Sequence, residues 1–162
     1  HYVTIARGTF SKSLASLGGY MAASKQVADY VRHASRPFIF SASMPPACAA
    51  SALEALHVLK ERPELVSRLS DLSRHMRDGL KKRGIAIRES ATPIIPLYTY
   101  ERMNTLVLSK KLYDEGVYVN PVLPPATPEG ECLLRTSYMA SHTFEILDEA
   151  LDIIERVFKE QA

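Results

Sequence analysis

The hydrophobic pattern of the chain changes at Gly84, and this change restricts the folds that the sequence can adopt. Before Gly84, apolar residues recur at steps of three and four, which places them on one face of an α-helix. These residues are Leu65, Leu69, Leu72, Met76 and Leu80. After Gly84, short apolar runs alternate with stretches of helical spacing. The pattern therefore predicts a long helix, kinked at Pro63 and closed by Gly84, that leads into a compact α/β unit.

This α/β unit is expected to extend from about residue 85 to the end of the chain. The pattern predicts strands at residues 94–100, 117–119 and 133–138, and helices at 104–115 and 144–158. Thr143 is expected to cap the last helix, because its hydroxyl can accept a hydrogen bond from a first-turn N–H group. The loop at residues 121–128 is rich in proline, so its backbone is expected to be stiff.

The first part of the chain is expected to mix short strands with helices. Residues 2–6 have the pattern of a strand, residues 17–23 that of a turn and a second strand, and residues 25–35 that of a helix. Pro37 is expected to stop this helix, and residues 38–40 are predicted to be a short buried strand. The next helix is expected to open at Pro45-Pro46, because a first-turn proline lacks only an N–H group that would have no partner.

Composition excludes several classes of function. A net charge of +2, with no basic run among aromatics, does not favour nucleic-acid binding. No apolar stretch is long enough to cross a bilayer and no secretory signal is visible, so a cytoplasmic protein is expected. Cys48 and Cys132 lack the spacing of metal ligands and are expected to be reduced. The chain has no initiating Met and begins within a strand-like run, as a fragment of a longer protein would.

Lys12 lies in a small polar loop, Gly8-Thr9-Phe10-Ser11-Lys12-Ser13, between an apolar run and a Gly-Gly pair. A lysine becomes nucleophilic where burial or neighbouring cations lower its pKa. The hydroxyls around it can bind a phosphate, and Gly8 lets the backbone approach a ligand closely. The composition of the loop also fits a solvated lysine. A Walker A phosphate loop is excluded, because that motif requires Gly-Lys-Ser/Thr and here Ser11 precedes the lysine.

Four separated blocks of the sequence have a distinctive composition. The first block is the Lys12 loop with its Gly-Gly pair, and the second is Phe38-Ile39-Phe40-Ser41-Ala42-Ser43-Met44-Pro45-Pro46. The third is Pro124-Pro125-Ala126-Thr127-Pro128-Glu129-Gly130, and the fourth is Leu134-Arg135-Thr136-Ser137 followed by Ala140-Ser141-His142-Thr143. These blocks resemble those of the α-oxoamine synthases, a family of pyridoxal-phosphate enzymes that includes serine palmitoyltransferase, 2-amino-3-ketobutyrate CoA ligase, 8-amino-7-oxononanoate synthase and 5-aminolevulinate synthase. Because the blocks occur in the family's order across nearly the whole chain, together they are more specific than any one of them.

The resemblance implies that Lys12 carries pyridoxal 5'-phosphate covalently and later moves the proton at the substrate α-carbon. It implies that Thr9 and Ser11 contact the cofactor phosphate. Ser41 or Ser43 would reach the same phosphate in the partner subunit of a homodimer with shared active sites. Some family members have threonine where this chain has Ala42.

Arg135 matches the family arginine that holds the carboxylate of the substrate amino acid, a task for which the planar guanidinium is suited. A surface arginine at a strand end remains the alternative for Arg135. His142 is expected to be structural, near the start of the last helix, rather than to line the site. Leu123 departs from the family, because some bacterial members have arginine at this position.

The resemblance implies a decarboxylative condensation of an amino acid with an acyl-CoA, and the blocks are most similar to bacterial serine palmitoyltransferases, which implies L-serine. Condensation of glycine with acetyl-CoA by 2-amino-3-ketobutyrate CoA ligase, or the reaction of 8-amino-7-oxononanoate synthase, is the alternative. A non-catalytic dimerising relative is also open, although such relatives typically lack the lysine. A generic aminotransferase is a third, less favoured reading.

The expected fold is the C-terminal part of an α/β enzyme of the aspartate-aminotransferase type, fold type I. Residues 1–46 would end the large cofactor-binding domain, residues 47–84 would form a long connecting helix, and residues 85–162 a small C-terminal α/β domain. In the family, the residues that face the cofactor ring lie well upstream of the lysine. A chain with eleven residues before Lys12 cannot contain them, so on its own it is expected to catalyse little.

Overall fold

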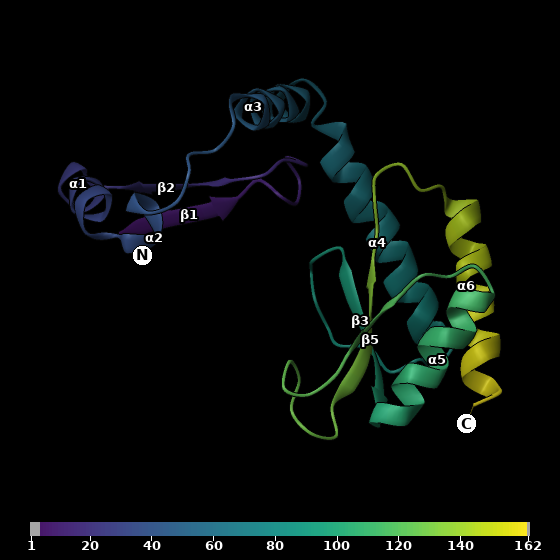
Figure 1. Cartoon of the computed structure of the whole chain (residues 1–162). Helices are drawn as coiled ribbons and strands as arrows, with labels where there is room; N and C mark the ends of the chain where they lie inside the picture. Colours follow the sequence, from purple (N-terminus) through teal and green to yellow (C-terminus); the bar gives the residue numbers. More distant parts are fainter. Residues whose placement is uncertain (1–3, 162) are drawn as a thin grey trace. The chain divides into compact units, whose positions relative to one another are not determined.

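The structure is a computed structural model that describes residues 4–161. The chain divides into two compact units, His1–Pro63 and Glu64–Ala162, and each unit has its own strands and helices (Figure 1). Both cysteines are free thiols, as expected: Cys48 is half-buried and Cys132 is buried. None of the helices within residues 4–161 is long and apolar enough to span a membrane.

The first unit is built on an antiparallel hairpin of β1 (Ile5–Thr9) and β2 (Gly19–Ala23). Three helices follow: α1 (Lys25–Ala34), α2 (Arg36–Ile39) and α3 (Pro46–Glu61). The Ser24 hydroxyl caps α1 by accepting a hydrogen bond from the Val27 N–H at 3.4 Å. The proline expected to open the third helix does so, at its first turn.

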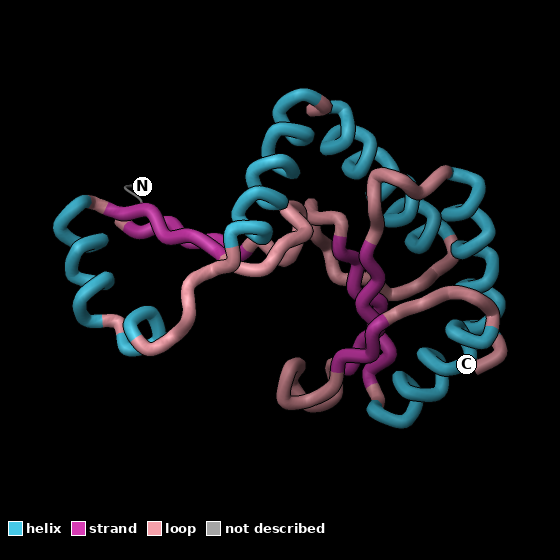
Figure 2. Tube along the Cα trace, turned by 45° about the horizontal axis from the view of Figure 1, so that its top comes forward, coloured by secondary structure: helices cyan, strands magenta, loops and turns pink. Residues whose placement is uncertain are grey.

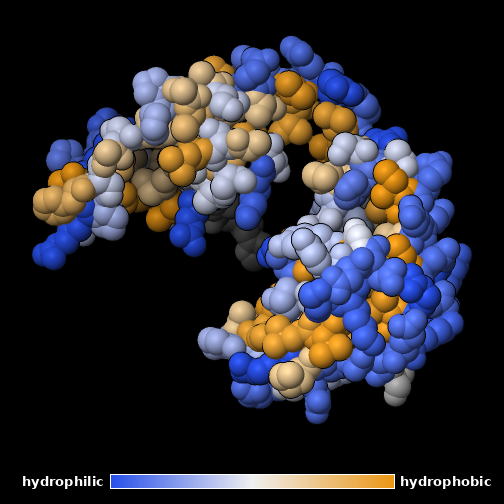
Figure 3. All heavy atoms as spheres, turned by 45° about the vertical axis from the view of Figure 1, so that its right-hand side comes forward, coloured by the Kyte–Doolittle hydropathy of each residue, from blue (hydrophilic) through white to orange (hydrophobic). Residues whose placement is uncertain are grey.

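Few side chains of the first unit are shielded from solvent. Within residues 4–63, Ala52 alone is buried. Large apolar side chains are exposed instead: they include Tyr20, Tyr30, Phe38, Ile39, Phe40 and Leu53. Figure 3 shows hydrophobic residues, in orange, at the surface of the molecule. Exposed apolar surface on this scale marks a surface that packs against other protein.

The second unit is a three-stranded antiparallel sheet covered on one face by helices. Its strands are β3 (Ile94–Tyr100), β4 (Asn120–Val122) and β5 (Cys132–Ser137), in the order β3-β5-β4. Its helices are α4 (Glu64–Lys82), α5 (Arg102–Asp114) and α6 (Phe144–Lys159). Gly84 and Gly116 follow α4 and α5 with φ of +74° and +88°, the left-handed conformation that ends many helices.

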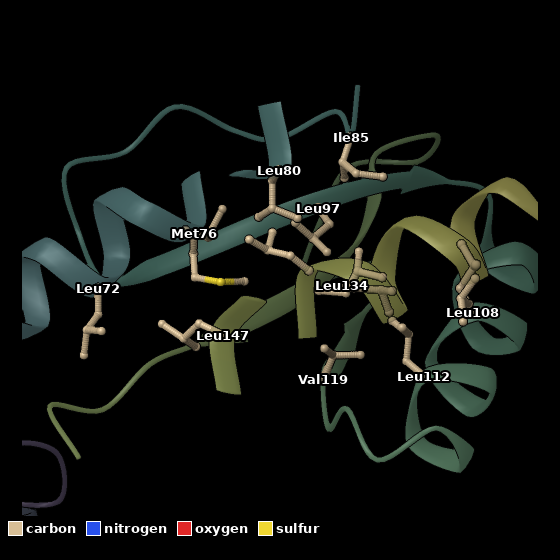
Figure 4. Close-up of a cluster of buried hydrophobic side chains, with 14 residues drawn as sticks. Leu72, Met76, Leu80, Ile85, Leu97, Leu108, Leu112, Val119, Leu134 and Leu147 are labelled. Carbon is tan, nitrogen blue, oxygen red and sulfur yellow. The ribbon is translucent and has the colours of Figure 1, made fainter. Parts of the chain in front are cut away.

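One hydrophobic core holds the second unit together. The apolar stripe of α4 supplies its buried half, Leu72, Met76 and Leu80, which meet Leu97 of β3 and Leu134 of β5 (Figure 4). The remaining labelled side chains come from α5, α6 and the segments between elements: Ile85, Leu108, Leu112, Val119 and Leu147. Alternate residues of β5 therefore face the core, and the residues between them face away from it.

Most predicted elements are confirmed, with shifted ends. The predicted 2–6 strand is β1 at Ile5–Thr9; residues 1–3 lie outside the described residues. The helix kink expected at Pro63 is a break, because α3 ends at Glu61 and α4 begins at Glu64. Thr143 caps α6 by accepting a hydrogen bond from the Ile146 N–H at 3.4 Å.

Two predicted strands are wrong. Residues 38–40 are not a buried strand: α2 ends at Ile39, Phe40 follows as its C-cap, and all three side chains are exposed. Pro37 lies in the first turn of α2, where its fixed φ favours a helix. The strand expected at 117–119 lies at Asn120–Val122 instead. Val119 is buried among the helices, so its hydrophobicity reflects core packing rather than strand pairing.

Candidate active site

Lys12 is held in the loop that joins β1 to β2. The loop is closed by two backbone hydrogen bonds of Phe10, from its N–H to the Gly18 carbonyl at 2.9 Å and to its carbonyl from the Ser16 N–H at 3.0 Å. Inside it, the Lys12 carbonyl accepts a hydrogen bond from the Ala15 N–H at 3.0 Å. The Ser16 hydroxyl donates to the Cys48 carbonyl at 2.7 Å, which fixes the loop to α3. The backbone at Lys12 is therefore defined, while its side chain is exposed.

The Gly-Gly pair after Lys12 allows the two strands to meet at the base of this loop. A Cβ atom at Gly19 would lie 2.6 Å from the Gly8 carbonyl oxygen, a contact with backbone that no side chain rotation relieves. Gly18 has φ of +118°, a conformation that residues with a side chain rarely adopt. The glycines are thus required for the conformation that presents Lys12.

Two hydroxyl groups lie together beside Lys12. The Ser11 hydroxyl donates to the Thr9 hydroxyl oxygen at 3.4 Å, and both side chains are exposed. Ser13, on the other side of the lysine, is exposed as well. Within the described part of the chain, the Lys12 amine makes no hydrogen bond or ion pair. A primary amine can bond covalently to an aldehyde, and neighbouring hydroxyl groups can donate hydrogen bonds to a phosphate. The loop therefore has both kinds of group that a phosphorylated aldehyde requires.

Thr9 also borders an open hollow of about 860 Å³ between the hairpin and α1. Tyr20 and Val31 line it, but Lys12 and Ser11 do not. Its walls are largely apolar, so the hollow is part of the exposed apolar surface of the first unit and not of the candidate site around Lys12.

Ser41 and Ser43 lie in the irregular segment between α2 and α3 and are exposed. Neither hydroxyl makes a hydrogen bond to a residue within 4–161. Both hydroxyls are therefore free to bind a phosphate. The proposed contact with a partner subunit remains a prediction for these two residues.

Arg135 lies in β5, on the sheet face that points away from the helices. Its sequence neighbours Leu134 and Thr136 are buried on the helix side, so the Arg135 side chain leaves on the other side and is exposed. Its partners across the sheet are Pro96 of β3 and Asn120 of β4. The guanidinium makes no hydrogen bond or ion pair to any residue that the structure describes. A free guanidinium on a rigid strand can bind a carboxylate through two parallel hydrogen bonds.

The turn that follows β5 is fixed by Arg68 of α4, a residue that no motif singled out. Its guanidinium donates to the carbonyl of Ala140 at 2.7 Å and to that of His142 at 2.8 Å. The His142 ring nitrogen Nδ1 accepts a hydrogen bond from the Met139 N–H at 3.4 Å. His142 therefore completes the turn before α6, in agreement with a structural role.

The loop between β4 and β5, part of the pink tube in Figure 2, contains the Pro-Pro block. The bond between Pro124 and Pro125 is cis, and the Ala126 N–H donates to the Leu123 carbonyl at 2.9 Å. The Thr127 hydroxyl is shielded from solvent and has no partner among residues 4–161. This loop therefore contains a buried hydroxyl to which the described residues offer no hydrogen bond.

Tyr138, the first residue after β5, belongs to a chain of hydrogen bonds whose direction is defined. Thr136 donates its hydroxyl proton to the Ile95 carbonyl at 2.8 Å, so its oxygen accepts from the Tyr138 hydroxyl at 2.7 Å. Burial raises the pKa of Tyr138 to about 12. The folded protein therefore favours the neutral phenol more strongly than the unfolded chain does.

We expect Tyr138 to make the protein less stable at alkaline pH. Its contribution is complete below pH 10, the pKa of an unperturbed tyrosine, and is lost as pH rises through about 12. By pH 11 about 1 kcal/mol should be lost relative to Tyr138→Phe, which cannot ionise. Urea unfolding of both proteins from pH 8 to pH 11 measures the difference, with Tyr113→Phe, at an exposed tyrosine, as the matched control. A constant difference across this range would contradict the prediction.

Comparison with known proteins agrees with these features. The profile of the aminotransferase class I and II family matches residues 1–154. Serine palmitoyltransferase of Bacteroides ovatus is 42% identical over 159 residues, which are 98% of this chain and 40% of that enzyme. Serine palmitoyltransferase of Bacteriovorax stolpii is 46% identical over 152 residues, 94% of this chain and 36% of that enzyme. 8-Amino-7-oxononanoate synthase 1 of Bacillus subtilis is 40% identical over 158 residues, 98% of this chain and 40% of that enzyme.

Solved structures give the same result. A serine palmitoyltransferase with pyridoxal phosphate superimposes with a TM-score of 0.91 and 32% identity, over 98% of this chain and 40% of that one. The enzyme of Sphingomonas wittichii has a TM-score of 0.90 with 32% identity, over 98% of this chain and 40% of that one. The predicted fold class is therefore confirmed, and the chain spans about 40% of the length of these relatives. The relatives that it resembles include serine palmitoyltransferases and 8-amino-7-oxononanoate synthases, two of the enzymes whose motif blocks the sequence resembles. The chain belongs to the aminotransferase class I and II family.

Proposed function

We propose that this protein condenses L-serine with a long-chain acyl-CoA, releasing CO₂ and free CoA, with pyridoxal phosphate carried on Lys12. The observation that carries the proposal is the 42% identity to serine palmitoyltransferase, which spans both the Lys12 loop and the Arg135 strand. The reaction is balanced when one proton is taken up by the CoA thiolate. Because the chain spans only part of its relatives, the proposal concerns the protein in its longest natural form.

The residues of the Lys12 loop fit the cofactor. The Lys12 amine is free to bond to its aldehyde carbon, and the Thr9 and Ser11 hydroxyls to hold its phosphate. When bound, pyridoxal phosphate supplies an electron sink for the bonds at the substrate α-carbon. The Lys12 amine would move the proton at that carbon. In this proposal Ser41 and Ser43 contact the phosphate of the cofactor that is bound in the partner subunit.

Arg135 holds the substrate carboxylate. Bidentate binding fixes the carboxylate in one plane, and this fixes which bond at the α-carbon is aligned for cleavage. Leu123 adds no positive charge. This proposal therefore assigns the carboxylate to Arg135, the cation of β5 and the loop before it.

The exposed apolar side chains of the first unit support a homodimer. A surface that includes Tyr30, Phe38 and Phe40 is unfavourable in water and becomes favourable when covered by protein. We propose that a second copy of the chain covers part of it. This assembly also supplies the partner phosphate for Ser41 and Ser43.

A reaction with the substrates of 8-amino-7-oxononanoate synthase is the second candidate. Two relatives with that name are 39% and 40% identical, each over 158 residues, only slightly below the serine palmitoyltransferases. The higher identity of the serine palmitoyltransferases is the reason for proposing L-serine, and glycine with acetyl-CoA is the third pair to test.

Two measurements test the proposal on the longest natural form of the protein. Reduction of the pyridoxal-phosphate complex with borohydride, followed by peptide mapping, should find the pyridoxyl group on Lys12. Carboxyl-labelled serine should then release labelled CO₂ only when palmitoyl-CoA is present. If Lys12 carried no pyridoxyl group, the protein would be a non-catalytic relative. If Lys12 carried the pyridoxyl group but CO₂ came from another amino acid, the proposed reaction would stand with a different substrate.

A further inference from the structure

Asn120 is the polar neighbour of Arg135 across the sheet. Strand β4 pairs with β5 so that Asn120 is the Cα partner of Arg135. Side chains of directly paired residues leave the sheet on the same face, with Cβ atoms about 5 Å apart. The partner on the other side is Pro96, which has no polar side chain. Of the two residues paired with Arg135, Asn120 alone can form a hydrogen bond with its guanidinium.

The amide of Asn120 is oriented by Tyr118. Its Nδ2 donates to the Tyr118 hydroxyl oxygen at 3.3 Å, and the side chain is half-buried. This contact leaves the Oδ1 atom as the free acceptor of the amide. Arginine has five N–H donors and no acceptor, so an amide oxygen beside it is a complementary partner.

A neutral acceptor suits this position better than a carboxylate. An aspartate here would pair with Arg135, cancel its charge and compete with an incoming carboxylate. Two residues along each strand, on the same face of the sheet, Leu133 is paired with Tyr98 and Val122. The side chains of Leu133 and Val122 have no hydrogen-bond acceptor that could replace Asn120. An amide can accept a hydrogen bond from the guanidinium without cancelling its charge.

The two side chains form no hydrogen bond in the structure, although their residues are paired across the sheet. We infer that Asn120 is a positioning residue for substrate recognition: when the amino acid binds, the Asn120 amide oxygen accepts a hydrogen bond from one edge of the Arg135 guanidinium, so that the other edge faces the carboxylate. The inference rests on the proposed function, because it assumes that Arg135 binds this carboxylate. It adds a residue of β4 to the determinants of amino-acid affinity. Tyr118 acts through Asn120 by keeping the amide in one orientation.

The test measures binding of amino acids to the full-length protein loaded with pyridoxal phosphate, and the change in cofactor absorbance reports the binding. In Asn120→Ala the Kd for serine should rise about tenfold, the range expected when a hydrogen bond to a charged group is lost. The Kd for 2-aminoethanol, which lacks the carboxylate, should stay unchanged. Asn120→Asp keeps the size of the side chain, so it should fold normally and weaken serine at least as much as alanine does.

Control variants separate positioning from a general structural effect. Ser137→Ala removes a polar group from the same exposed sheet face and should leave the serine Kd unchanged. Added to Arg135→Ala, Asn120→Ala should weaken serine no further, because the two residues act as one unit. The KM for the acyl-CoA should not change in Asn120→Ala.

Each outcome decides the matter. An unchanged serine Kd in Asn120→Ala, with Arg135→Ala impaired, overturns this inference and leaves the proposed function intact. Equal weakening of serine and 2-aminoethanol also overturns it, since that pattern indicates a distorted sheet. If the unsubstituted protein shows no absorbance change with any amino acid, the proposed function fails and the inference fails with it.

Discussion

Replacing Lys12 with alanine is expected to lower turnover by about 1,000-fold or more, because one side chain both carries the cofactor and moves a proton. The loop should keep its conformation, since its hydrogen bonds are made by the backbone of Phe10, Lys12 and Ala15 rather than by the amine. Single-turnover formation of the aminoketone measures the loss. Peptide mapping after borohydride reduction should find no pyridoxyl group on the variant.

Two further variants make this result specific. Lys12→Arg retains the positive charge but cannot bond to the aldehyde, so it should be as inactive as alanine. Lys60→Ala removes an exposed lysine from α3 of the same unit and should retain full turnover. Added methylamine should restore part of the activity of Lys12→Ala by replacing the missing amine. Turnover above a tenth of the unsubstituted value in Lys12→Ala would contradict the assigned role.

The second unit could be predicted well because its pattern is strongly periodic. The spacing of Leu147, Leu151 and Ile154 predicted α6, and these residues are buried in the core. The stripe of α4 was equally clear, although its first half, with Leu65 and Leu69, is only half-buried. Periodicity reports the face that a helix buries, so it works best where one core covers the element along its length.

The first unit was harder to predict because hydrophobicity there does not report burial. Phe38, Ile39 and Phe40 are apolar, yet all three are exposed and Phe38 and Ile39 belong to a short helix. A run of three apolar residues cannot distinguish a buried strand from a helix turn. These side chains have no core within the described part of their unit to fill, and that lack is not visible in the sequence.

The residues of the candidate site also differ in how well the sequence predicts them. Lys12, Thr9, Ser11 and Arg135 could be singled out from motifs, because each block keeps its residues close along the chain. Asn120 could not, since its relation to Arg135 depends on the register of β4 against β5. A shift of one residue in that register would move Asn120 to the opposite sheet face. The strand was expected at residues 117–119, and from that position the pairing could not be inferred.

Replacing Arg135 with alanine is expected to weaken amino-acid binding about 100-fold, because loss of one partner of a hydrogen-bonded charge pair costs about 2–5 kcal/mol. Arg135→Lys should lose about tenfold, since lysine keeps the charge but not the planar pair of donors. The fold should tolerate both changes, because the side chain is exposed and the core residues Leu134 and Thr136 stay in place. Titration of the cofactor absorbance with serine measures the affinity, and Arg102→Ala, at an exposed arginine of α5, is the matched control. If Arg135→Ala bound serine and 2-aminoethanol with unchanged affinities, Arg135 would be an ordinary surface residue and the carboxylate would have to be held elsewhere.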